Sequence, residues 1–188
     1  SDLIADGTAA MVLSVEPMEA LRYAEMLRPD GWIVTDVTPL KNVAAYPDTG
    51  RLFEVLFSAP RLVAVDAAAL ARKAGMVKAN NVVMLGAAAS LLPLPSELVE
   101  KHLRALFAAK GERVVSTNLR AFRMGDAAGR FAAALVARGA PAGLVARVVP
   151  RLAFGAEPVA EDLTAQWLDR LLAPDAPAAA ARLFDSGD

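Results

Sequence analysis

Two acidic side chains stand where apolar runs give way to helical patterns. Glu16 follows the apolar run 9–15 and precedes Pro17, and Asp66 closes the run 61–66. A carboxylate in this place can accept N–H bonds from the first turn of the following helix, or it can contact a ligand. We favour capping for both residues and keep ligand contact as the alternative.

A third acidic residue, Asp36, lies near the end of the apolar run 32–37. It can contact a ribose or a partner protein, and it can equally be a buried carboxylate whose bonds are satisfied within the chain. Ligands of parallel sheets bind beyond the carboxyl ends of the strands. The ligand- or interface-contact candidates at these ends are therefore Glu16, Pro17, Thr38 and Asp66.

Amide and arginine side chains supply further candidates. Asn81 stands where an apolar helical stretch begins, and Asn118 is placed similarly. An Asn there can cap a helix, bond a neighbouring loop or contact a ligand. Arg120 together with Arg123 can meet a phosphate or an acidic partner, although a solvated helix face is the usual place for such a pair.

Catalytic and metal-binding motifs are sparse. The one histidine, His102, lies four residues from both Leu98 and Leu106, so we expect it to be packed and hydrogen-bonded rather than catalytic. The sequence contains no G-x-S-x-G, G-x-G-x-x-G or Walker A motif. It also has no cysteine, which excludes disulfides, a cysteine nucleophile and thiolate ligands for zinc or iron–sulfur clusters. We assign no catalytic residue and no metal ligand.

Three short apolar runs, 9–15, 32–37 and 61–66, are predicted strands that position the acidic candidates. Helical patterns follow them over 17–28, 51–57 and 67–74, with Pro29-Asp30-Gly31 predicted as a turn and Gly75 as a helix end. Strand-then-helix alternation predicts a parallel sheet. The expected fold is therefore α/β, a three-layer Rossmann-like arrangement of a mostly parallel sheet with helices on both faces.

The rest of the chain is predicted to be helical. The predicted helices are 78–92, a helix capped by Ser96 that reaches Gly111, 115–138, and 161–172. Gly86, Gly125 and Gly129 lie inside these helices, where small residues indicate close contact or a break. We divide the chain into residues 1–139 and a helical C-terminal extension, 140–188.

The overall composition limits the classes of partner. Net charge is −1, so there is no electrostatic reason to expect nucleic acid or an anionic membrane. The most apolar run, 82–95, is shorter than a membrane span and contains two prolines. Because no secretion signal is visible either, we expect a cytoplasmic protein. Hydrophobic residues make up 55% of the chain, which favours a sheet covered on both faces or a permanent partner.

Four blocks of sequence together resemble a known family. They are Val15-Glu16-Pro17-Met18-Glu19-Ala20-Leu21-Arg22, residues 66–75, residues 79–87 and residues 118–125. In this order they look like the gamma-type module of 2-oxoacid:ferredoxin oxidoreductases, closest to the beta subunit of the indolepyruvate enzymes. Residues 1–139 are similar to the later part of that module, and the glycine-rich loop of the family, G-x-G-G-x-G, is expected upstream of Ser1.

The resemblance implies a function that the residues alone do not show. Such complexes oxidatively decarboxylate a 2-oxoacid, join the acyl group to coenzyme A and pass electrons to ferredoxin. Thiamine diphosphate and iron–sulfur clusters then belong to partner subunits, coenzyme A lies near this chain, and the isolated chain is inactive. The alternatives are a stand-alone nucleotide- or acyl-CoA-binding Rossmann-like domain, and an independent hydrolase or transferase that uses Glu16, Asp66 or His102.

Overall fold

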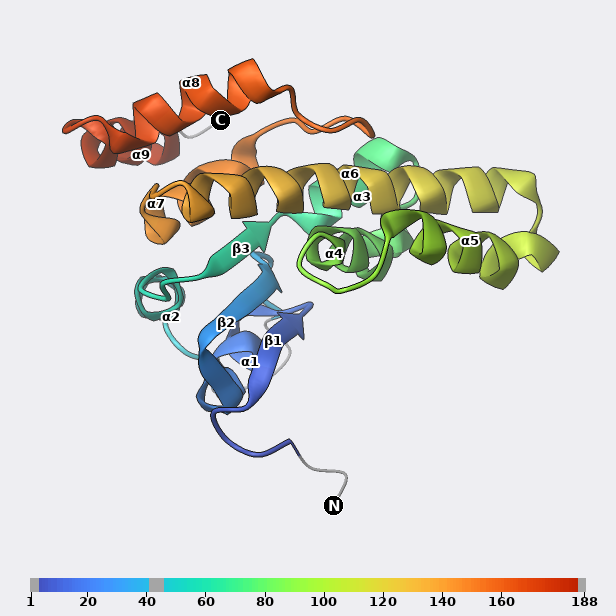
Figure 1. The fold of residues 1–188 in the computed structure, drawn as a ribbon, viewed down its shortest axis with the longest axis horizontal. Helices are drawn as coiled ribbons and strands as arrows, with labels where there is room; N and C mark the ends of the chain where they lie inside the picture. Colours follow the sequence, from blue (N-terminus) through green and yellow to red (C-terminus); the bar gives the residue numbers. More distant parts are fainter. Residues whose placement is uncertain (1–3, 41–45, 186–188) are drawn as a thin grey trace.

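A small parallel sheet forms the centre of the computed structural model, which describes residues 4–40 and 46–185. Its strands are β1 (Ala9–Ser14), β2 (Leu27–Asp36) and β3 (Leu62–Val65), in the order β1-β2-β3 (Figure 1). Both pairings are parallel, with Ser14 opposite Thr35 and Asp36 opposite Val65. The predicted parallel α/β fold is confirmed.

Three helices follow the three strands: α1 (Pro17–Arg22), α2 (Thr49–Phe57) and α3 (Ala67–Ala74). Pro17 occupies the first turn of α1, where a missing N–H costs nothing. Gly75 ends α3 with φ +94°, a left-handed conformation that glycine adopts without steric cost. The predicted end of α3 is therefore confirmed.

The segment between α1 and β2 differs from its prediction. The helix expected to reach residue 28 ends at Arg22, and a single 3₁₀ turn (Ala24–Met26) leads directly into β2. Pro29-Asp30-Gly31 lies within β2 rather than in a turn. The pairing register with β1 shifts between Ala9 and Met11, opposite this stretch. Such an irregularity tolerates a proline, which cannot donate to the ladder, so the strand begins earlier than its apolar run.

Helices cover both faces of the sheet, as predicted. On one face Val34, Val63 and Val65 pack against α3, α4 (Asn80–Ala89) and α6 (Glu112–Ala137). On the other face the alternate residues Ile33, Leu62 and Ala64 pack against α1, α2 and α7 (Ala142–Val148). Because side chains of a strand alternate between faces, two apolar layers arise from one set of apolar strands.

The helix pair α4–α6 is the tightest packing in the described chain. A Cβ added at Gly86 would lie 2.0 Å from the carbonyl oxygen of Phe122, and one added at Gly129 would lie 2.1 Å from that of Ala87. The small residues therefore mark close contact, not a break. A 3₁₀ turn (Val77–Ala79) precedes α4, which begins at Asn80.

Helix α5 (Ser96–Phe107) packs against α6 and leads through a 3₁₀ turn (Ala108–Lys110) to Gly111. The prediction that Ser96 caps α5 is wrong. Pro95 occupies the cap position, and Ser96 is the first helical residue. Its hydroxyl instead accepts a 2.9 Å bond from Nη2 of Arg130 in α6.

The residues after Gly139 join the same core. Helix α7 and the 3₁₀ turn Val149–Arg151 pack on β3, and α8 (Glu161–Leu172) packs on α6, with α9 (Ala176–Asp185) beside it (Figure 1). Val145, Val148, Phe154 and Leu171 are buried in one cluster with Val63. None of the helices in the described chain has the length and apolar character to cross a membrane.

Candidate functional site

The strand ends bring three acidic side chains to one edge of the sheet. Because the strands are parallel, the residues that follow them meet at the same end. We name this place the carboxyl edge and define it by Glu16, Asp36, Thr38 and Asp66. It is the region where a ligand of a parallel sheet is expected.

Asp36 is the buried centre of the carboxyl edge. Its Oδ1 accepts bonds from the backbone N–H of Thr38 (3.1 Å), the hydroxyl of Thr38 (3.1 Å) and the backbone N–H of Ala67 (3.2 Å). Burial raises the pKa of this carboxyl group above its ordinary value; the bonds from Thr38 and Ala67 oppose that rise, and the nearby charge of Asp66 adds to it. Oδ1 of Asp36 thus ties the end of β2 to the start of α3.

Glu16 and Asp66 cap the helices that follow them, as their positions predict. Glu16 Oε2 accepts from the N–H of Glu19 at 2.8 Å, and Asp66 Oδ1 accepts from that of Ala69 at 2.7 Å. The other oxygen of Glu16, Oε1, accepts a bond from the hydroxyl of Tyr46. Glu16 is buried, whereas Asp66 is partly exposed. Capping uses one oxygen of each carboxylate.

Tyr46 forms a bond at the carboxyl edge that the sequence did not predict. It lies 30 residues from Glu16, between the predicted strand 32–37 and the predicted helix 51–57. The pKa of its hydroxyl is raised strongly by burial, by the bond to Glu16 and by the negative charge of that carboxylate. No spacing rule connects the two residues, so the pair emerges only from the fold.

The other edge candidates differ in accessibility. Thr38 is exposed, whereas Pro17, in the first turn of α1, is buried. Asn81 is exposed near the start of α4, whose N-terminus has no side-chain cap. Asn118 is buried in α6 and donates to the carbonyl oxygen of Val114 at 2.8 Å and to Sδ of Met76 at 3.3 Å. Asn118 therefore bonds a neighbouring segment, one of its predicted roles.

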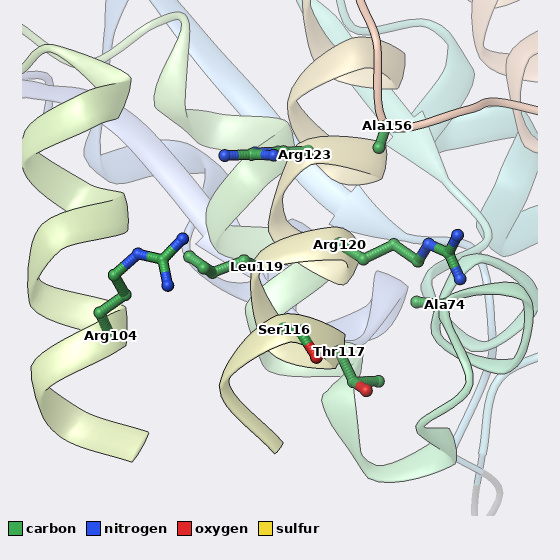
Figure 2. A pocket seen from close by; sticks show the side chains of 8 residues that line it. All are labelled: Ala74, Arg104, Ser116, Thr117, Leu119, Arg120, Arg123 and Ala156. Atoms are coloured by element: carbon green, nitrogen blue, oxygen red, sulfur yellow. The ribbon is translucent and has the colours of Figure 1, made fainter. Parts of the chain in front are cut away.

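Arg120 lies apart from Asp36 and its neighbours, in a groove that runs along α6. We name it the arginine groove; its cavity measures about 430 Å³. Figure 2 shows α6 in the middle, α5 on one side, and Ala74 and Ala156 on the other. The other residues that line the groove are Arg104, Ser116, Thr117, Leu119, Arg120 and Arg123.

The arginines of the groove are not equivalent. Arg123 forms two 2.7 Å bonds with the carboxylate of Glu100, and Arg104 lies 3.7 Å from Glu112. Arg120 has neither a hydrogen bond nor an ion pair with another residue in the described part of the chain. Arg120 and Arg123 are both exposed, as on the solvated helix face that is usual for such a pair, and one of the two guanidiniums is engaged while the other is open.

The prediction for His102 is wrong. Its side chain is exposed, and so are Leu98 (39%) and Leu106 (68%) on the same side of α5. The reason is that α5 contacts the domain through α6, which buries only Leu103 fully. Leu98, His102 and Leu106 therefore lie on the outer face of α5 rather than on its packed face.

Chemistry at a metal ion finds no support in the described residues. Across residues 4–40 and 46–185, no three Asp, Glu or His side chains gather in a way that could hold a metal ion. The sequence also supplies no thiolate. The residues therefore do not fit an iron–sulfur cluster.

Comparison with known proteins gives a family match and several relatives of the chain. The profile of the pyruvate ferredoxin/flavodoxin oxidoreductase family matches residues 1–128. The chain is 33% identical over 132 residues to indolepyruvate oxidoreductase subunit IorB of Archaeoglobus fulgidus. It is 34% identical over 134 residues to IorB of Pyrococcus horikoshii, and 31% over 133 to IorB of Thermococcus kodakarensis.

Each of these three alignments covers 65% of this chain and 64% of the relative, so the chain spans somewhat less than two thirds of the relatives it matches. No solved structure matches significantly. The matched region contains the sheet, Asp36 with its neighbours at the strand ends, and most of the arginine groove. The chain belongs to the pyruvate ferredoxin/flavodoxin oxidoreductase family.

Proposed function

We propose that this chain is a subunit, or part of a subunit, of an indolepyruvate:ferredoxin oxidoreductase. The observation that carries the proposal is the family match over residues 1–128, joined to relatives that are named as subunits of indolepyruvate oxidoreductase. The complex would decarboxylate a 2-oxoacid, transfer the acyl group to coenzyme A and pass electrons to ferredoxin.

The chemistry of that reaction lies outside this chain. Iron–sulfur clusters are held by thiolates, and the chain has no cysteine. We therefore assign the clusters to partner subunits, and we assign thiamine diphosphate to partner subunits as well because the family implies it. The role proposed for the chain is to shape the assembly, and its residues make no bond to the reacting atoms.

The charge of the carboxyl edge bears on where coenzyme A lies. Glu16, Asp36 and Asp66 gather there, and each already accepts backbone N–H bonds. Phosphate groups brought against three acidic side chains would be repelled unless a cation intervened. We therefore place coenzyme A near this chain but not on the carboxyl edge, with its phosphates on basic groups elsewhere in the complex.

Purification of the tagged chain from its native source tests the proposal. The expected result is a complex of fixed stoichiometry that contains thiamine diphosphate and iron–sulfur clusters. This complex should reduce ferredoxin or methyl viologen when indolepyruvate and coenzyme A are supplied. Parallel assays with pyruvate and 2-oxoglutarate identify the preferred oxoacid.

Two results would contradict the proposal. The first is a chain that elutes alone from size-exclusion chromatography at the mass of a monomer. In that case a stand-alone nucleotide- or acyl-CoA-binding domain becomes the better description, and equilibrium binding of ATP and acetyl-CoA decides between the two. The second is a complex that forms but oxidises no 2-oxoacid.

A further inference from the structure

The arginine groove combines a rigid wall with one open cation. Its floor is α6, a helix of 26 residues locked against α4 by backbone-to-backbone contact at Gly125 and Gly129. Arg120 and Arg123 are therefore carried on a helix whose position is fixed, while Arg104 lies on α5. Fixed charges lose less conformational freedom on binding than charges on a loop, which favours recognition at this surface.

Three arginines and three glutamates surround the groove, but within the described residues they are not paired one to one. Two carboxylates, Glu100 and Glu112, face Arg123 and Arg104, and the charge of Glu157 also acts on Arg123. Arg120 has no acidic partner of its own at bonding distance. The hydroxyls of Ser116 and Thr117 already donate to the carbonyl oxygen of Arg113, so they offer acceptors rather than donors. The open donor in the groove is the guanidinium of Arg120.

The directions of the arginines determine which anion fits. Figure 2 shows Arg104 and Arg123 extending to one side of α6, while Arg120 extends to the other side, toward Ala74. They do not converge on one point, so a single small oxyanion cannot be held by all three. An extended chain, whose side chains on one face repeat at about 6.6 Å, can instead meet separated arginines with successive carboxylates.

We propose that the arginine groove binds an extended acidic segment of a partner protein, with Arg120 as its main anchor. A carboxylate of the segment accepts a bidentate bond from Arg120, and a second one shares Arg123 with Glu100. Leu119, Ala74 and Ala156 give the segment a small apolar contact between these charges. The inference rests on the proposed function only for the identity of the partner, which is another subunit of the complex.

A synthetic peptide tests the groove without the complex. The probe is a fluorescein-labelled peptide of four Glu-Ser repeats, and the readout is anisotropy with the full chain in low salt. Saturable binding is expected, weakened by added sodium chloride. Arg120→Glu should weaken it at least about tenfold, and Arg120→Gln by a smaller factor. Arg51→Glu is the matched control: it makes the same charge change on the exposed face of α2, outside the groove, and should bind like the unaltered chain.

Several outcomes would overturn the inference. It fails if the peptide does not bind, or if Arg120→Glu and Arg51→Glu weaken binding equally, since the effect would then be one of net charge. It also fails if inorganic phosphate or coenzyme A displaces the peptide at concentrations well below the peptide's own dissociation constant, because the groove would then be a phosphate site. Circular dichroism confirms that Arg120→Glu is folded. Failure of the complex to form leaves the peptide result intact, so the two proposals can fail separately.

Discussion

Gly125 of α6 lies directly against the main-chain carbonyl group of Val83 in α4: a Cβ at Gly125 would be 2.0 Å from that oxygen. Gly86 makes the reciprocal contact from α4, and Gly129 repeats it one turn further along α6. Backbone touches backbone at three points, so no side chain can adjust to relieve an added methyl group. Helices α4 and α6, two of those that cover one face of the sheet, are therefore held at a separation that only glycine allows.

Gly125→Ala should destabilise the chain by about 3 kcal/mol or more, at the upper end of the cost of overpacking. The helices must move apart, and the buried cluster around Val83 opens with them. Chemical denaturation measures the loss in the free energy of unfolding. Gly50→Ala, in α2 beside the movable side chain of Asp48, is the control and should change stability by no more than about 1 kcal/mol. Equal effects at the two positions would show that helix spacing is not fixed by the glycine contacts.

Asp36→Asn should change how stability depends on pH. Burial raises the folded-state pKa of Asp36, so its protonated form is favoured by folding. The stability that the chain gains from protonated Asp36 is fully present below the unfolded pKa of about 3.9. It disappears as the pH rises through the folded pKa. Asn keeps an oxygen that can accept the bonds of Thr38 and Ala67.

The measured quantity is therefore the unfolding free energy of the unaltered chain minus that of Asp36→Asn, from urea titrations between pH 3.5 and 7.5. We expect this difference to fall as the pH rises. A difference that stays constant across the range would mean that Asp36 has the same pKa in the folded and unfolded chains.

The sequence predicted the features of the fold that depend on neighbouring residues. Asp66 caps α3 and Gly75 ends it because each needs only the residues within one helical turn. The three strands and their parallel order followed from apolar runs separated by helical patterns. Gly86 and Gly125 indicated close contact or a break within their helices, and the structure shows close contact, between α4 and α6.

Features that depend on distant segments escaped prediction. Leu98 and Leu106 beside His102 have the spacing of a buried helix face. Whether such a face is covered depends on which helix packs against it. The early start of β2 depends on an irregular pairing with β1. The bond between Tyr46 and Glu16 joins residues that are 30 apart, and nothing in the loop composition marks it. At the candidate site, the sequence identified Arg120 but not the groove along α6 that it lines.

Tyr46→Phe should destabilise the chain by about 1.5–3 kcal/mol, because it leaves one oxygen of the buried Glu16 carboxylate without its donor. The folded-state pKa of Tyr46 is raised. Its stabilising contribution is therefore present at neutral pH and is lost as the pH rises above the unfolded value of about 10. Urea denaturation at pH 7 measures the first effect. Urea denaturation at alkaline pH measures the second, and absorbance at 295 nm during an alkaline titration reports the raised pKa on which it depends. Tyr23→Phe, at the exposed tyrosine, should leave stability unchanged.

The bond between Glu100 and Arg123 should couple α5 to α6 weakly but measurably. The pair is bidentate, yet the Arg123 side chain is 45% exposed, so water and salt screen much of its attraction. A double-mutant cycle with Glu100→Gln and Arg123→Gln should give a coupling of about 0.5–1 kcal/mol at low ionic strength, and less in 1 M salt.

The pH dependence of the coupling between Glu100 and Arg123 shows whether the interaction is electrostatic. The bond from Arg123 holds the pKa of Glu100 below its ordinary value, so the coupling is present above the unfolded pKa of about 4.3 and is lost as the pH falls through the folded pKa. A coupling that persists at pH 2 would show that the two side chains interact through packing rather than charge. Arg120→Gln provides the matched comparison one turn away, and it should leave stability unchanged at every pH because Arg120 has no bonded partner in the described part of the chain. Agreement of both results would separate the arginine that holds α5 in place from the one that is open for recognition.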